Sequence, residues 1–163
     1  MTSVVSNNKD DTILANILAT LQGVTVDGQA VFEQVTICHS REQAHETEFT
    51  DSPIAAIVCE TTDVYLIAGL EEGCVIRADI LVAVSGGTPT VRNRDLTRAI
   101  NAARNVLNTS IPTLAHGFPD AGGDYHPRLM LGTPERENDP DDPWAMAWLP
   151  LEVAYRTTSD TTH

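Results

Sequence analysis

The sequence has little positive charge. Lys9 is its one lysine, and nine arginines face 23 acidic residues, for a net charge of −13. A chain with this balance repels nucleic acid as a whole, which argues against a domain that reads DNA or RNA sequence. No apolar run reaches the about 18 residues that a membrane-spanning helix needs, and the polar start is no signal peptide. We therefore expect a soluble, intracellular protein without a membrane partner.

Motifs for common catalytic chemistry are also missing. There is no GxGxxG or GxSxG pattern, and the glycine pair in 85–88 lacks the lysine of a phosphate-binding loop. The cysteines Cys38, Cys59 and Cys74 are odd in number, show no CxxC spacing and lie in apolar runs. This is typical of buried thiols in a reducing compartment. We predict no catalytic residue, no cofactor and no enzymatic activity.

Hydrophobic periodicity, in contrast, is clear. A length of 163 residues with 42% hydrophobic residues predicts one domain over 1–163. Apolar residues at helical spacing predict a helix over 11–21, capped by Asp10 or Asp11, and a second helix that begins at Asn93 and runs to Leu107. Alternating or continuous apolar runs predict strands over 31–38, 54–59, 64–68, 74–84 and 147–155.

Short links between the central strands make them antiparallel, and two amphipathic helices can cover one face of their sheet. The predicted fold class is therefore α+β in two layers, with a mostly antiparallel sheet of about four to five strands and both helices on one face. We expect flexible tails at 1–10 and 157–163. We also expect a long, structureless loop over 113–144, which holds five prolines and an acidic cluster.

The long loop holds one cluster with possible metal chemistry: His116, Asp120, Asp124 and His126. Two imidazoles and two carboxylates could bind a divalent transition metal, which could activate water. Their spacing matches no metal motif, however, and a Gly/Pro loop lacks the rigidity that catalysis needs. We predict no metal site, and a small metal-dependent hydrolase that uses this loop is the alternative from another functional class.

Two groups of residues are candidates for contacts with a partner. Arg94 and Arg98 lie one turn apart, opposite the apolar stripe of the second helix. They could form a solvated face with Asp95, or contact the acidic surface of a partner or of a second copy. Two tryptophans follow the acidic loop, where each could anchor an interface or cover the core. The interface candidates are Arg94, Arg98, Arg104, Trp144 and Trp148.

A family resemblance rests on four segments and on their order in the chain. These are the opening helix over 11–21 with its ILxxILxxL stripe, the run SPIAAIV over 52–58, the long strand over 75–84 that leads into helix 94–107, and the closing strand over 149–156. In this order and hydrophobic pattern, the chain resembles the tail terminator and neck (tail-completion) proteins of tailed bacteriophages. The resemblance covers most of residues 11–157.

The resemblance implies a structural virion protein, assembled in the host cytoplasm and located in the tail or neck. Such subunits form a homo-oligomeric ring, usually a hexamer, that caps the tail tube, stops its polymerisation and joins it to a head-completion or connector protein. The tube protein and a sheath protein are further expected partners. DNA passes through the lumen without being read; six copies at −13 each would carry −78, so an acidic lumen would let DNA slide.

The long loop over 113–144 exceeds what a minimal terminator fold needs. The alternative within the same class is therefore another neck or head–tail connector protein. A binding module that does not assemble is the third possibility.

Overall fold

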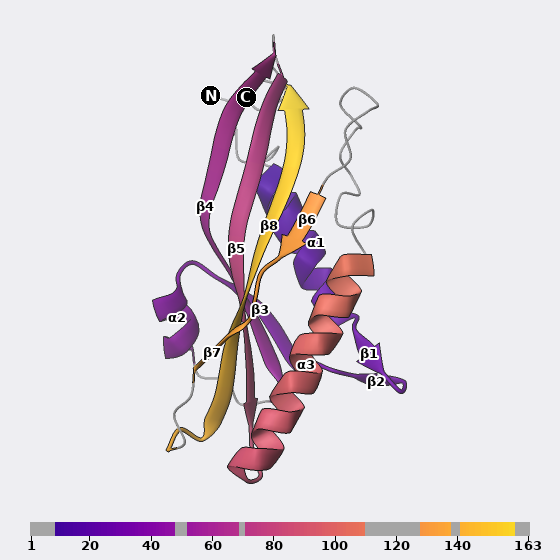
Figure 1. Ribbon diagram of the computed structural model, residues 1–163, viewed down its shortest axis with the longest axis vertical. Coiled ribbons are helices and arrows are strands. Elements are labelled where there is room, and N and C mark those ends of the chain that lie inside the picture. Colours follow the sequence, from indigo (N-terminus) through magenta and orange to yellow (C-terminus); the bar gives the residue numbers. More distant parts are fainter. Residues whose placement is uncertain (1–8, 48–51, 69–70, 110–127, 138–140, 159–163) are drawn as a thin grey trace.

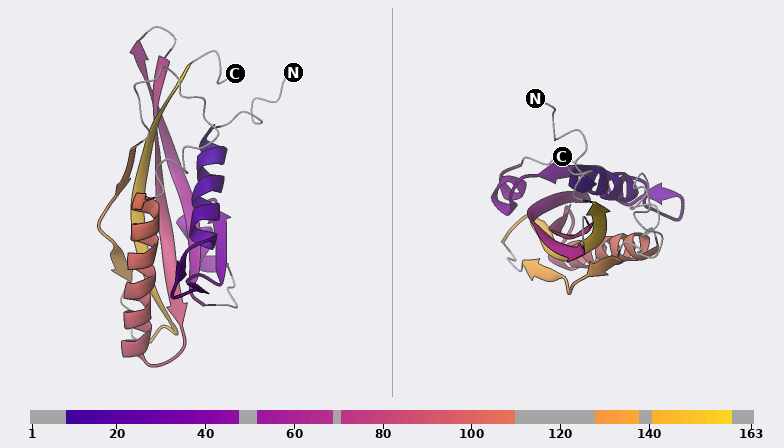
Figure 2. Two further views of the ribbon diagram at one scale, coloured as in Figure 1. Left: turned by 90° about the vertical axis from the view of Figure 1, so that its right-hand side faces the viewer. Right: turned by 90° about the horizontal axis from the view of Figure 1, so that it is seen from above.

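The computed structural model describes residues 9–47, 52–68, 71–109, 128–137 and 141–158. Helices α1 (Lys9–Gln22) and α3 (Pro89–Thr109) cover one face of a sheet, and the short helix α2 (Arg41–Glu46) lies on the other (Figures 1 and 2). The predicted α+β class is confirmed, as is the placement of two amphipathic helices on one face. None of the described helices is long and apolar enough to cross a membrane.

The main sheet has six strands: in spatial order β3 (Gln34–Cys38), β4 (Ile54–Ala68), β5 (Glu71–Ser85), β8 (Trp144–Thr158) and β6 (Arg128–Leu131), with β7 (Glu135–Glu137) also paired to β8. The sheet is mostly antiparallel, as predicted, and only its β3–β4 pair is parallel. A separate hairpin of β1 (Thr25–Val26) and β2 (Gln29–Ala30) follows α1.

Strand β5 is the centre of the sheet. It pairs with β8 from Glu71 to Ser85 without a register shift, and with β4 on its other side. Successive side chains of a strand point to opposite faces. Ile76 and Ile80 therefore join the core under α1 and α3, whereas Leu81 packs on the opposite face with Ala44 of α2. The alternation predicted over 74–84 is confirmed.

The core under the two long helices is the larger one. Each buried leucine or isoleucine contributes about 1.5–3 kcal/mol relative to an exposed one. The helices supply Ile13, Leu14, Ile17, Leu21, Leu96, Ile100, Ala103 and Leu107. A smaller core on the other face, which periodicity did not predict, consists of Cys38, Ala44, Ala56, Val58, Leu81 and Trp148.

Two predicted strands are in fact one. The sequence predicted separate strands at 54–59 and 64–68, but β4 runs unbroken from Ile54 to Ala68. The register shifts between Cys59 and Thr61. A bulge of this kind accommodates one extra residue, so a polar segment can continue the strand because it pairs with β5 along its length.

Three other boundaries were wrong. The second helix begins at Pro89, before Asn93, because proline is tolerated in a first turn and Thr88 Oγ1 accepts a hydrogen bond from the Val91 N–H at 3.3 Å. The predicted loop over 113–144 contains β6 and β7, both stabilised by pairing with β8. The predicted tails are shorter, since α1 begins at Lys9 and β8 ends at Thr158; residues 1–8 and 159–163 lie outside the described residues.

Three strands extend beyond the ends of the helices (Figure 1). Strand β3 pairs with β4 over 54–58, and β6 pairs with β8 over 151–154. Past these points β4, β5 and β8 continue as a three-stranded extension. Within the described ranges, neither β4 over 60–68 nor β8 over 155–158 pairs with a further strand on its outer side.

Leu107→Ala should lower the free energy of unfolding by about 2–5 kcal/mol, because it opens a cavity where α3 meets the sheet. The Leu107 side chain is fully buried. Urea denaturation followed by circular dichroism measures the change. The adjacent, exposed Asn108 provides the control, and Asn108→Ala should change stability by less than about 0.5 kcal/mol. Equal effects of the two variants would contradict the packing of α3.

Candidate functional site

Trp148 lies at the centre of a polar cluster between α2 and the sheet. The residue is 2% exposed, and its Nε1 donates a hydrogen bond to Glu137 Oε1 at 2.8 Å. The Arg41 guanidinium lies 4.5 Å from the centroid of the indole ring and pairs with Asp79 Oδ2 at 2.9 Å. His45 Nε2 lies 3.2 Å from the same Glu137 oxygen. These contacts attach α2 and β7 to the sheet.

An open groove of about 400 Å³ lies on the same side of the sheet. Its lining comes from α2 and the residue after it, from β5, and from the start of β8 and the turn before it: Ala44, His45, Thr47, Leu81, Ala83, Asp142, Trp144 and Met146. The Trp144 backbone N–H donates to Asp142 Oδ1 at 2.9 Å, which holds this carboxylate beside the half-buried Trp144. An indole next to a carboxylate suits a guanidinium group, which can stack on the one and pair with the other.

Strand β7 divides its charges between the two faces of the sheet. Glu137 contacts Trp148, so Glu135, two residues earlier, lies on the same face. Arg136 points to the opposite face, where its Nη2 donates to Thr97 Oγ1 of α3 at 2.7 Å. One short strand thus adds two carboxylates to the side of α2 and one cation to the side of α3.

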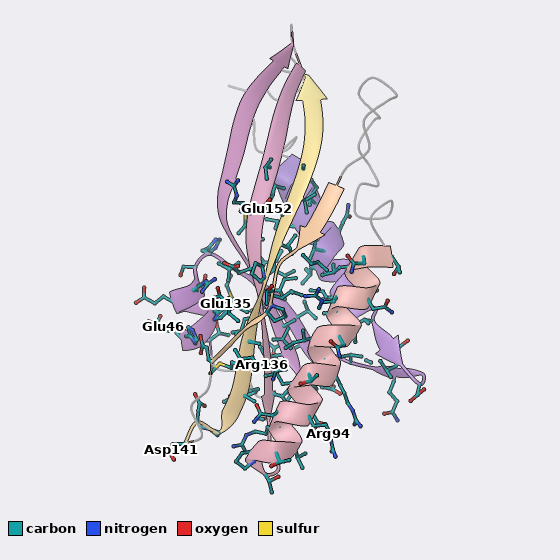
Figure 3. All side chains as sticks on the ribbon, in the orientation of Figure 1. Glu46, Arg94, Glu135, Arg136, Asp141 and Glu152 are labelled. Atoms are coloured by element: carbon teal, nitrogen blue, oxygen red, sulfur yellow. The ribbon has the colours of Figure 1, made fainter. Side chains whose placement is uncertain are left out.

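The surface formed by α2, β7 and the groove, termed the α2 face, is acidic. Two ion pairs on it are internally neutral, Arg41–Asp79 at 2.9 Å and Arg77–Glu152 at 3.1 Å. Beyond these pairs and Glu137, which contacts His45 and Trp148, its carboxylates are Glu42, Glu46, Glu135 and Asp142. Figure 3 shows Glu46 and Glu135 on this side of the molecule.

The outer surface of α3, termed the α3 face, has the opposite charge. The helix carries four arginines and one aspartate, for a net charge of +3. Arg94 and Arg98 have side chains that are 58% and 72% exposed, and Figure 3 shows Arg94 on the side away from α2. Asp95 lies 3.6 Å from Arg94 Nε and 4.0 Å from Arg98 Nη1. Such long, exposed ion pairs are weak.

The five interface candidates fall into two groups. Arg104 and Trp148 make contacts within the chain: Arg104 Nη1 donates to the Gly132 carbonyl at 3.0 Å, and Trp148 fills the smaller core. Of the two alternatives for Trp148, the core position is therefore confirmed. Arg94 and Arg98 face solvent, and Trp144 lines the groove. The structure thus leaves three of the five residues at a surface.

Sequence reasoning missed the contribution of α2 because the polar segment over 39–52 predicted a loop with at most one helical turn. A local signal was present: Ser40 is followed three residues later by Gln43, the spacing of a capping box. In the structure, Ser40 Oγ accepts a hydrogen bond from the Gln43 N–H at 3.0 Å. The partnership of Glu137 with Trp148 had no such signal, since it depends on how β7 pairs with β8.

The predicted metal cluster of His116, Asp120, Asp124 and His126 lies outside the described residues. Within the described part of the chain, no group of three or more His, Cys, Asp or Glu side chains is placed to hold a metal ion. Cys38 and Cys74 are buried.

Comparison with known proteins identifies no family for this chain. No model of a protein family matches the chain, and no curated protein matches it at a significant level.

Glu137→Ala should lower the free energy of unfolding by about 1–3 kcal/mol, because it leaves the buried indole N–H of Trp148 without its acceptor. Urea denaturation monitored by tryptophan fluorescence measures the loss. Glu135→Ala removes the same charge from the same face of β7 and should change stability by less than about 0.5 kcal/mol. If both variants behave alike, the hydrogen bond to Trp148 does not stabilise the fold.

Proposed function

We propose that the protein is a ring-forming tail terminator, a structural virion protein with no enzymatic activity and no cofactor. The ring caps the phage tail tube, stops its polymerisation and joins it to head-completion or connector proteins. The order of the helices and strands, which resembles this family, supports the assignment. Another neck or head–tail connector protein is the alternative within the same class, and none of the described residues favours a metal-dependent hydrolase.

The observation that carries the proposal is the three-stranded extension with its open edges. An exposed edge strand presents a row of unpaired N–H and C=O groups, and a protein that stays monomeric usually covers or shortens such an edge. Here β4 over 60–68 has no further strand on its outer side within the described residues. A segment of this length suits strand addition by a neighbouring subunit, either another copy or a subunit of the tube.

The charge of the chain fits a passage for DNA. A ring of subunits at −13 each has a strongly negative interior surface unless its cations line the channel. DNA then moves through without being held, because counterion release, the main source of nonspecific affinity, requires lysines or arginines at the phosphates. The location is the virion tail or neck, after assembly in the host cytoplasm.

Light scattering after size exclusion, over a concentration series, should show a discrete species near six times the 17.6 kDa chain. Electron microscopy should show this species as an annulus. Mixed with the tail tube protein of the same virus, the annuli should lie at tube ends and stop elongation. A chain that stays monomeric at every concentration and also leaves tube growth unchanged would rule the function out.

Hydrogen exchange should locate the contact of the extension. In β4 over 61–68, amides directed to β5 are paired already, whereas those directed outward are open within the described residues. If a neighbour adds a strand, the outward amides should exchange at least about tenfold more slowly after assembly, in an alternating pattern. Slowing on self-association assigns the contact to another copy, and slowing only with the tube protein assigns it to the tube. Unchanged exchange in both states would exclude this edge as a contact.

A further inference from the structure

We infer that copies of this chain join head to tail, with the α3 face of one copy bound to the α2 face of the next. The inference rests on the proposed ring and names the surfaces that close it. The α3 face contributes the exposed guanidinium groups of Arg94 and Arg98. The α2 face contributes exposed carboxylates, among them Glu46 and Glu135, and the groove beside them.

Charge complementarity selects this pair of surfaces. Helix α3 has a net charge of +3 in a chain of net charge −13, so it is a cationic surface on an acidic protein. The only carboxylate of α3, Asp95, is too far from Arg98 Nη1, at 4.0 Å, to neutralise it well. The α2 face keeps four carboxylates beyond its internal contacts, Glu42, Glu46, Glu135 and Asp142. Opposite charges of this kind orient two proteins and speed their association.

The two faces lie on opposite sides of the sheet. Helix α3 packs on the larger core and α2 on the smaller one, with β5 between them. A contact between different patches on opposite sides cannot be satisfied by a two-fold pair, since one copy keeps an unused α2 face and the other an unused α3 face. Such a heterologous contact repeats until it closes as a ring or continues as a filament. The charge distribution itself therefore favours a heterologous assembly, of which the proposed ring is the closed form.

The groove supplies a receptor for one of the arginines. Its Trp144 and Asp142 can stack on and pair with a guanidinium group that enters from the neighbouring copy. Both Arg94 and Arg98 are long, exposed side chains on one face of a rigid helix, one turn apart. Their use in the contact also keeps these two cations out of the channel.

A charge-swap series tests the inference. Arg94→Glu/Arg98→Glu makes both faces acidic, and Glu46→Arg/Glu135→Arg adds cations to the α2 face; each pair should weaken self-association at low salt by about tenfold or more. The variant that combines all four substitutions exchanges the charges at the contact positions, so it should recover part of the association that Arg94→Glu/Arg98→Glu loses. Every position is exposed, and a cation at Glu46 in the last turn of α2 is favourable for the helix dipole.

A matched pair of variants controls for net charge. Arg94→Gln/Arg98→Gln and Thr25→Glu/Gln29→Glu both change the net charge from −13 to −15, the second on the exposed β1–β2 hairpin. Only the first should weaken association, and Trp144→Leu should weaken it as well. Thermal unfolding of each variant shows that it is folded. If Glu46→Arg/Glu135→Arg lowers the melting temperature, Glu46→Gln/Glu135→Gln is measured in its place.

The outcomes separate this inference from the proposed function. Rings that form equally well in both charge-reversed pairs would overturn the inference and leave the function intact. Swap-sensitive assembly that gives filaments, or rings without any effect on tubes, would support the inference and contradict the function. A wild-type chain that is monomeric at low salt even at high concentration, or a fourfold variant that is folded but does not recover association, would overturn the inference.

Discussion

The uninterrupted pairing of β5 with β8 is the constraint on which the other features depend. Along its whole length β5 keeps one register with β8, so every side chain of both strands is assigned to one face or the other. A shift by one residue would move Ile76 and Ile80 out of the larger core and bring Arg77 and Asp79 into it, at a prohibitive cost. Hydrophobic burial on two faces thus fixes the register, and the register fixes where the charges go.

The separation of charge follows from the same alternation. On β7, neighbouring residues point to opposite sides, and its two glutamates and one arginine divide between the α2 face and α3. On β5, the odd-numbered Arg77 and Asp79 lie on the α2 face and find partners there. Helix α3 adds Arg94 and Arg98 to the other side because its apolar stripe faces the sheet. An acidic protein consequently has one cationic surface opposite an acidic one.

One end of the same sheet has strand edges that pair with no further described strand. Beyond β3 and β6, the two outer strands of the extension, β4 over 60–68 and β8 over 155–158, pair only with β5 within the described residues. The two helix faces and the extension lie at different parts of the elongated molecule (Figure 1). A subunit built in this way can contact copies of itself through its charged faces and a further strand through its edge, which is the combination that a ring at the end of a tube requires.

The sequence by itself determined the two long helices, the central strands and the α+β class, because their apolar residues repeat at the spacing of a helix or a strand. It also identified Arg94 and Arg98 as the cations of an exposed helix face. It could not show that the polar segment over 60–63 continues β4, or that β6 and β7 lie in a proline-rich stretch, since those strands are stabilised by partners distant in the sequence.

Whether Trp148 covers the core or faces a partner was likewise decided by tertiary structure. The indole is buried because α2 packs over it and Glu137, brought near by β7, accepts its N–H. Local spacing encodes which side of an element is apolar, and only the assembled sheet decides what lies against it.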